Sequence, residues 1–280
     1  MAPNAKKKRK PIPEERRLNH LGGKEWARYS ISVWSIAKSA AERKLKHPAL
    51  LPRELCERLV KIYTKPGMVV LDPFAGSGSV LVAAKALGRN AVGLELNPEY
   101  ARLAAERLER TEVEEELVQG GEFPRCEVHA ADVAKLDELV RPGSVDLCVT
   151  SPPYWNVLRR RRTADYKEAR PYSDDDDRDL GNLEDYGEFL ARLDEAFRSV
   201  RRALKPKGHC AVVVMDLRKK SKFIPFHVDV AKALVDAGFT WTDVIVWDRR
   251  AEYNSLRPLG YPTTFVVNKT HEYVLLFRRE

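Results

Sequence analysis

Residues 71–80 read LDPFAGSGSV, a composition that suits binding of a small ligand by backbone groups. Gly76 and Gly78 let the backbone approach a ligand closely, and the start of a helix supplies free N–H groups. The segment is not the Gly-x-Gly-x-x-Gly motif of dinucleotide-binding folds, because residue 81 is leucine. A glycine pair is also common in plain tight turns, so the segment alone does not define a site.

Two acidic side chains further along the chain support a ligand site. Glu95 stands 23 residues after Asp72 at the end of a second predicted strand, where an acid can bind ribose hydroxyls. Asp132 follows a third predicted strand. Because parallel strands end at the same edge of a sheet, where ligands of such folds bind, these features predict one shared site.

The segment Ser151-Pro152-Pro153-Tyr154 follows a fourth predicted strand. The two prolines stiffen the backbone and remove N–H donors, so the neighbouring carbonyls act as fixed acceptors. Ser151 adds a hydroxyl, and Tyr154 adds a ring on which a base can stack. Acceptors beside an aromatic ring suit a flat substrate with an exocyclic amino group. A plain turn remains the alternative interpretation, which the adjacent ligand loop disfavours.

These residues need strands and helices in alternation to position them. Short apolar runs predict seven strands, at residues 68–71, 91–95, 126–129, 145–150, 211–215, 244–247 and 273–277. Helical spacing predicts helices at residues 52–63, 80–87, from 98, 186–204 and 228–235, with Asn97-Pro98 as a cap and first turn. This alternation predicts an α/β fold with a doubly wound, mostly parallel seven-stranded sheet.

The charge of +8 over 280 residues is concentrated at the start of the chain. Residues 1–20 form a predicted basic, flexible arm, including the run Lys6–Lys10, and residues 21–280 form one domain with a short insert at about 155–182. A basic arm suits a polyanion such as nucleic acid, although a solvated tail that aids solubility is an equal alternative. The run also resembles a nuclear-import patch, a match that is frequent by chance.

Composition excludes several classes of protein. No stretch approaches the roughly 20 apolar residues of a membrane span, and the N-terminus has no apolar signal region. Four dispersed cysteines without Cys-x-x-Cys argue against a zinc cluster and indicate a reducing, cytoplasmic location. A single glutamine beside abundant Arg, Lys and Glu suggests a thermophilic source.

With these motifs in place, the chain resembles the amino-methyltransferases of nucleic acids, which make N4-methylcytosine or N6-methyladenine from S-adenosylmethionine. DPFAGSG resembles the family's cofactor loop, GLELNPEY its ribose-binding segment and SPPY its catalytic motif. HPALLPRELCERLV resembles the helix before the cofactor strand, and VIVWDR and NKTHEYVLLF resemble the last two strands. The resemblance spans roughly residues 30 to 280, and the serine form of the catalytic motif is closer to the cytosine-N4 enzymes.

The resemblance implies a role for each matching residue. Ser151 and the carbonyl of Pro152 would accept hydrogen bonds from the target amino group, in a motif completed by Pro153 and by Tyr154 stacking on the base. Asp132 would contact the adenine of the cofactor. The full set of expected cofactor-binding residues is Asp72, Pro73, Phe74, Ala75, Gly76, Ser77, Gly78, Glu95 and Asp132.

The neighbouring reaction at cytosine C5 is not expected, because it needs a cysteine nucleophile that its family carries in a Pro-Cys pair, and none of the four cysteines here follows a proline. Alternatives to cytosine-N4 methylation are adenine-N6 methylation of DNA, a non-catalytic nucleic-acid-binding protein on the same fold, and a small-molecule methyltransferase. Intact motifs disfavour the non-catalytic protein, and the basic arm disfavours the small-molecule enzyme.

The substrate is DNA or structured RNA, and the sequence favours neither. The family resemblance favours DNA, but the insert is much shorter than the target-recognition regions of sequence-specific DNA enzymes. Basic residues alternate with aromatic ones in the insert, a pattern that suits phosphates and unstacked bases. The expected nucleic-acid contacts are Arg159, Arg160, Arg161, Arg162 and Lys167, while Asp174–Asp177 are interpreted as solvated charges rather than metal ligands.

Overall fold

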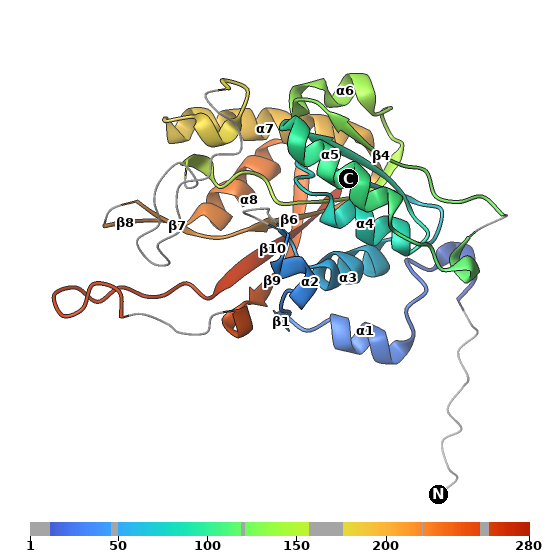
Figure 1. Ribbon diagram of the computed structural model, residues 1–280, viewed down its shortest axis with the longest axis horizontal. Helices are drawn as coiled ribbons and strands as arrows, with labels where there is room; N and C mark the ends of the chain where they lie inside the picture. Colours follow the sequence, from blue (N-terminus) through green and yellow to red (C-terminus); the bar gives the residue numbers. More distant parts are fainter. Residues whose placement is uncertain (1–11, 46–49, 119–120, 157–175, 220, 253–257) are drawn as a thin grey trace, which may run out of the picture.

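The computed structural model describes residues 12–45, 50–118, 121–156, 176–219, 221–252 and 258–280 (Figure 1). Eight strands form one sheet in the order β1-β9-β10-β6-β5-β2-β3-β4. They span Val33–Ser35 (β1), Val69–Asp72 (β2), Asn90–Glu95 (β3), Cys126–Ala130 (β4), Val145–Thr150 (β5), Leu204–Val214 (β6), Phe239–Asp248 (β9) and His271–Arg279 (β10). A separate antiparallel ribbon joins Leu217–Lys219 (β7) to Lys222–Ile224 (β8).

The pairing confirms the doubly wound, mostly parallel sheet. Only β10 runs antiparallel to its two neighbours, and every other adjacent pair is parallel. The count exceeds the predicted seven by one, because β1 adds to the edge of the sheet beside β9. The strand β1 has only three residues, which are exposed, buried and exposed in turn. A segment this short does not show the two-residue period of a strand in the sequence.

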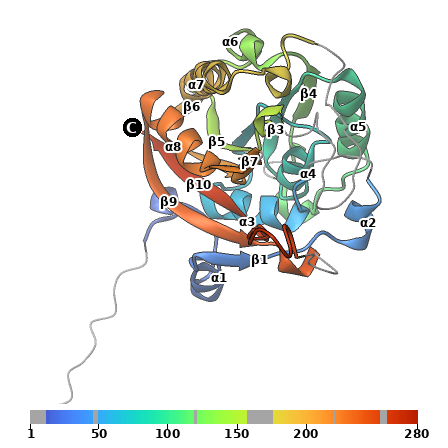
Figure 2. The same cartoon turned by 90° about the vertical axis from the view of Figure 1, so that its left-hand side faces the viewer.

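Helices cover both faces of the sheet (Figure 2). Alternate strand residues belong to two separate cores: Val149 and Val213 pack with the helices α3 and α4, whereas Val212 and Leu275 pack with α7 and α8. This division follows from the two-residue period of a strand buried on both sides. The helices span Gly23–Tyr29 (α1), Ala40–Arg43 (α2), Arg53–Tyr63 (α3), Ser79–Ala86 (α4), Pro98–Glu109 (α5), Leu136–Leu139 (α6), Tyr186–Ala203 (α7) and Phe226–Asp236 (α8).

The local signals for helix starts operate as the sequence predicts. The Asn97 side chain accepts hydrogen bonds from the backbone N–H groups of Glu99 and Tyr100 at the start of α5. Asp185 caps α7 in the same way. All five helices that the periodicity predicts are found, as α3, α4, α5, α7 and α8. Their ends differ from the predicted ones by at most two residues.

The basic arm at residues 1–20 stays a prediction, because residues 1–11 lie outside the described residues, but two of its last residues contact the domain. Asn19 is buried and donates from Nδ2 to the carbonyl of Ile62 at 2.6 Å. Lys65 also lies 3.4 Å from a carboxylate oxygen of Glu14. Residues from about Glu14 onward therefore pack against the end of α3, because a buried amide needs a fixed partner.

Gly78, which precedes α4, is predicted to be essential for close packing. Its φ is +78°, and an added Cβ would lie 2.8 Å from the Cβ of Ala104. Gly143 has a φ of +65° with no atom within 4 Å of an added Cβ, so it isolates the backbone cost. Gly143→Ala should cost about 1 kcal/mol of unfolding free energy from left-handed backbone strain, and Gly78→Ala at least about 2 kcal/mol because the clash adds to it. Denaturant unfolding measures both, and equal losses would contradict the packing argument.

Candidate active site

The loop between β2 and α4 is held by backbone hydrogen bonds and one buried arginine contact. Gly76 has a φ of +53°, and its N–H donates to Oε2 of Glu95 at 2.7 Å. The N–H of Ala75 donates to the carbonyl of Leu94 at 2.8 Å. Arg107 of α5 donates to the carbonyl and hydroxyl oxygens of Ser77. The loop therefore has a fixed shape that depends on β3 and α5 as well as on its own sequence.

Asp72, at the end of β2, is a buried carboxyl group that joins two strands. Its Oδ1 accepts a hydrogen bond from the Thr150 hydroxyl at 2.7 Å and one from the Phe74 N–H at 3.2 Å. Burial raises the pKa of Asp72 to about 7; these two hydrogen bonds oppose the rise and nearby Glu95 adds to it. Asp72 thus changes charge near neutral pH.

Glu95, at the end of β3, has both carboxylate oxygens fixed by backbone donors. Oε2 accepts from Gly76, and Oε1 accepts from the N–H of Asn97 at 2.8 Å. Burial raises the pKa of Glu95, and the hydrogen bonds from Asn97 and Gly76 oppose that rise. Each oxygen keeps a lone pair for a ligand. Asp132, after β4, accepts from the N–H of Ala134 at 2.9 Å.

These groups surround one cleft with about 820 Å³ of empty space including its open mouth, a size typical of small-molecule sites. Of the expected cofactor-binding residues, all except Gly78 line it. Of the expected catalytic residues, Ser151 and Pro153 line it, whereas Pro152 and Tyr154 do not. Eleven further lining residues were not among the predicted site residues: Leu50, Leu51, Ser79, Val80, Leu96, Asn97, Ala131, Val133, Arg178, Asp179 and Leu180.

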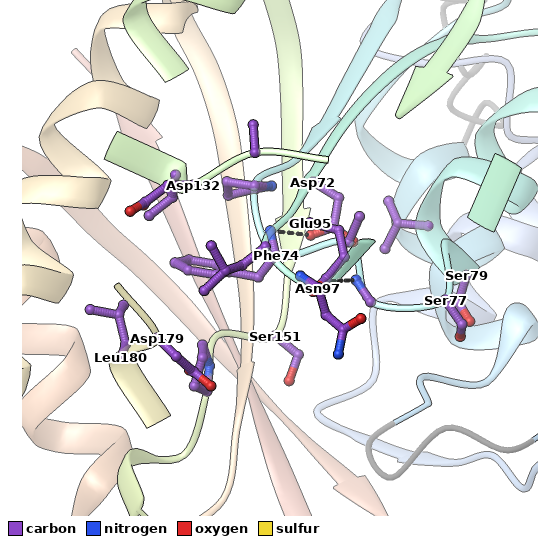
Figure 3. A pocket seen from close by; sticks show the side chains of 18 of the residues that line it. Asp72, Phe74, Ser77, Ser79, Glu95, Asn97, Asp132, Ser151, Asp179 and Leu180 are labelled. Atoms are coloured by element: carbon purple, nitrogen blue, oxygen red, sulfur yellow. Dashed lines mark hydrogen bonds between the residues drawn. The ribbon is translucent and has the colours of Figure 1, made fainter. Parts of the chain in front are cut away.

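The last three of these residues come from the end of the predicted insert, directly after the undescribed stretch 157–175. Figure 3 shows Asp179 and Leu180 in the wall of the cleft beside Ser151, on a segment separate from the glycine loop. Asp179 is buried and caps the short turn Leu180–Asn182. The only sequence signal was the return of apolar residues after the aspartate run. The expected contacts Arg159–Arg162 and Lys167 lie outside the described residues.

Tyr154 does not line this cleft, and it is partly buried. Its ring lies edge-on to Phe226, with centroids 5.9 Å apart, and burial raises its pKa well above the ordinary tyrosine value. The next residue, Trp155, is buried at a φ of +47°, a left-handed conformation that costs energy for a bulky side chain. A sharp turn therefore ends the catalytic motif.

The described ranges of the chain contain neither a metal-binding cluster nor a membrane-spanning helix. They contain no group of three or more His, Cys, Asp or Glu side chains arranged to hold a metal ion. No helix within them combines the length and the apolar character needed to cross a membrane.

The pKa of Asp72 predicts a pH-dependent contribution to stability. Because the folded pKa of about 7 exceeds the ordinary value of 3.8, the folded state holds a proton that the unfolded state has lost between these pH values. Wild-type stability should therefore fall relative to Asp72→Asn as pH rises from about 4 to about 7, by up to about 4 kcal/mol. Denaturant unfolding of both ligand-free proteins across this range measures the difference. A constant difference would show that the pKa of Asp72 is the same in the folded and unfolded states, and a change in the opposite direction would show that folding lowers it.

Known proteins resemble this chain in both sequence and structure. A family model described as DNA methylase, of the N6/N4 methyltransferase type, matches residues 2–106 and 145–280. Among curated relatives, the type II methyltransferase M2.DpnII of Streptococcus pneumoniae is 43% identical over 79 residues, which are 28% of this chain and 30% of the relative. M.SmaI of Serratia marcescens is 48% identical over 79 residues, which are 28% of this chain and 26% of the relative.

The chain thus covers less than a third of the length of these two relatives. Among solved structures, TrmN from Thermus thermophilus superposes with a TM-score of 0.50 at 16% identity, over 83% of this chain and 50% of that one. This likeness shows the fold alone. The family model spans most of the sequence, including both motif segments. The chain therefore belongs to the N6/N4 DNA methylase family, and its cofactor is S-adenosylmethionine.

Proposed function

We propose that this protein transfers a methyl group from S-adenosylmethionine to the exocyclic N4 nitrogen of cytosine in nucleic acid. The observation that supports this most directly is the shared cleft, in which Ser151 lies with Asp72 and Glu95 on adjoining strands. A methyl donor bound by the acids would lie next to the serine. The serine form of the motif supports cytosine N4 over adenine N6, since adenine enzymes usually carry Asp or Asn at this position.

The lining of the cleft fits this cofactor in charge. S-adenosylmethionine supplies an activated methyl group on a positively charged sulfonium. The described lining contains more carboxyl groups than guanidinium groups, since Arg178 is its one basic side chain. This excess of acidic groups suits a cationic ligand. The hydroxyl of Ser79 is buried with no hydrogen-bond partner among the described residues, which suits a polar group of the ligand. The lining carboxyl groups are those of Asp72, Glu95, Asp132 and Asp179.

We assign a different part of the cofactor to each acid. Glu95 would bind the ribose hydroxyls, because backbone donors orient both of its oxygens at the end of β3. Asp132 would contact the adenine, with Phe74 and Leu180 as nearby apolar walls. Asp72 would face the cationic end, because its hydrogen bond to Thr150 places it beside the residue before Ser151.

The catalytic motif would act by positioning and by accepting hydrogen bonds. The lone pair of an exocyclic amino group is delocalised into the base, so the nitrogen is a weak nucleophile. Acceptors at Ser151 and at the carbonyl of Pro152 would draw the amino group toward tetrahedral geometry and localise that lone pair. S-adenosylmethionine held by Asp72, Glu95 and Asp132 would supply the methyl group from its sulfonium, leaving a neutral thioether. The nitrogen would gain the methyl group and release its extra proton to water. A target in a duplex must first leave the base stack.

DNA is the substrate class that the family description supports, and RNA is tested beside it. The insert residues Arg159–Arg162 and Lys167 remain proposed contacts near the target, as does Tyr154 stacking on the base. The basic arm at residues 1–20 remains a proposal, and Glu14 and Asn19 within it contact the domain. A cytoplasmic location and a thermophilic source remain proposals from cysteine usage and the scarcity of glutamine.

The product of the reaction tests the proposal. Purified protein, isotopically labelled S-adenosylmethionine and separate DNA and RNA substrates should yield labelled N4-methylcytosine in nucleoside mass spectrometry. Labelled N6-methyladenine would replace the cytosine assignment with the adenine one. No label in either nucleic acid, with cofactor binding intact, would favour a non-catalytic protein, and 5-methylcytosine would refute this interpretation of the site.

Ser151→Ala is the control for the same assay. This substitution removes a hydrogen-bond acceptor that the target amino group would use in the transition state. Turnover should therefore fall roughly 10²-fold, while the affinity for the cofactor stays nearly constant. Calorimetry measures the affinity on the same protein preparation.

The arm and the insert are predicted to differ in role. Deleting residues 1–11 should flatten the salt dependence of binding by roughly 0.9 in log–log slope per lost phosphate contact on a duplex, or about 0.7 on a single strand. Turnover at saturating substrate should survive this deletion. Replacing Arg159–Arg162 with alanine should instead lower turnover on the preferred target. Salt titrations and single-turnover rates separate the roles, and an unchanged slope for the deletion would show that the arm makes no phosphate contacts.

A further inference from the structure

The Tyr154 hydroxyl is the centre of a buried hydrogen-bond chain that joins the catalytic motif to the C-terminal strands. Its oxygen lies 3.3 Å from the Ser151 Oγ, 2.9 Å from Oε2 of Glu272 and 3.4 Å from the carbonyl oxygen of Val213. Glu272, the second residue of β10, is only 5% exposed. It is separated from Tyr154 by 118 residues in sequence, and no sequence pattern identified it as part of the site.

Arg249 pairs with Glu272 and orients its carboxylate. Its Nη1 contacts Oε1, the carboxylate oxygen that does not face Tyr154. The same guanidinium donates through Nε and Nη2 to Glu252, whose Oε1 accepts from the backbone N–H of Lys38. A buried carboxylate paired in this way with a guanidinium has only acceptor atoms to offer Tyr154.

This arrangement determines which group donates at each link of the chain. A tyrosine hydroxyl has one hydrogen, and both Glu272 Oε2 and the Val213 carbonyl can only accept it. The remaining contact of that hydroxyl, with Ser151, must then use the serine hydrogen. With its hydrogen turned toward Tyr154, the Ser151 oxygen has only lone pairs for the cleft that it lines.

We propose that Glu272 is a positioning residue that makes Ser151 an obligate hydrogen-bond acceptor, so that the site selects a target base by its amino group. The inference rests on the proposed function, but it holds for cytosine N4 and adenine N6 alike. An oxygen that can only accept binds an amino N–H and repels a carbonyl oxygen at the same place. The site would thus discriminate cytosine from uracil or thymine, which carry a carbonyl where cytosine has its amino group.

Glu272→Gln tests the proposal because it reverses the polarity of the chain without changing its shape. The Arg249 guanidinium would hold the amide oxygen of the new side chain, so the amide NH₂ would face Tyr154. The tyrosine oxygen would then accept from the amide and its hydrogen would turn to the Ser151 oxygen, so that the serine hydrogen would be released toward the cleft. We expect kcat to fall about 10- to 100-fold, with the KM for nucleic acid and the affinity for S-adenosylmethionine nearly unchanged.

A double-mutant cycle separates this role from a merely structural one. If Glu272 acts through Ser151, then Glu272→Gln should have little further effect on kcat in a Ser151→Ala background. Glu252→Gln is the matched control, because it alters a partner of the same arginine but not the group facing Tyr154. The fold-losses of kcat caused by Glu252→Gln and by Ser151→Ala should multiply in the double variant. All variants are compared in the full-length protein, with melting temperature and cofactor affinity recorded for each.

The outcomes are distinct. A Glu272→Gln variant that keeps wild-type kcat, or whose loss multiplies fully with that of Ser151→Ala, would overturn the proposal. If Glu272→Gln does not fold, Tyr154→Phe keeps the ring and removes only the linking hydroxyl, and its loss should likewise vanish in the Ser151→Ala background. Full turnover by Tyr154→Phe would also overturn the proposal. Wild-type protein that methylates no base refutes the proposed function itself, which is a different result.

Discussion

The hydrogen bond between Thr150 and Asp72 joins the two halves of the candidate active site. Thr150 is the last residue of β5 and Asp72 the last residue of β2, and these strands pair in parallel with Leu71 beside Cys148. Ser151 therefore follows directly from the residue that holds the first acid of the cofactor loop. Without this pairing, the two motifs would be 79 residues apart in the chain with no fixed distance between them.

The site also depends on acids that stabilise the loop and remain available to a ligand. Glu95 binds the backbone of the glycine loop and of the turn after β3, which fixes its carboxylate without exhausting its lone pairs. Arg107 holds the far side of the same loop through Ser77. The glycine loop is thus preorganised by contacts from β3 and α5, which lowers the cost of ordering it on binding.

The C-terminal strands add a second constraint, of charge rather than shape. Arg249, directly after β9, and Glu272, the second residue of β10, form a largely buried ion pair next to Tyr154. Burying such a pair is costly unless its remaining atoms are also bonded, and here Glu252 and Tyr154 supply those bonds. The antiparallel β10 strand brings this pair to the catalytic edge.

The sequence alone determined the order of most strands and helices, because the apolar periods and caps that define them are local. It also located the glycine loop, Glu95, Asp132 and the SPPY segment, since each stands at the end of a recognisable strand. Only the tertiary structure decided that β1 adds an eighth strand, that Asn19 is packed, and that Arg178 to Leu180 line the cleft. The same holds for the link from Tyr154 to Glu272. These features arise from contacts between residues distant in sequence, and a local pattern contains no information about which distant partner a side chain will meet.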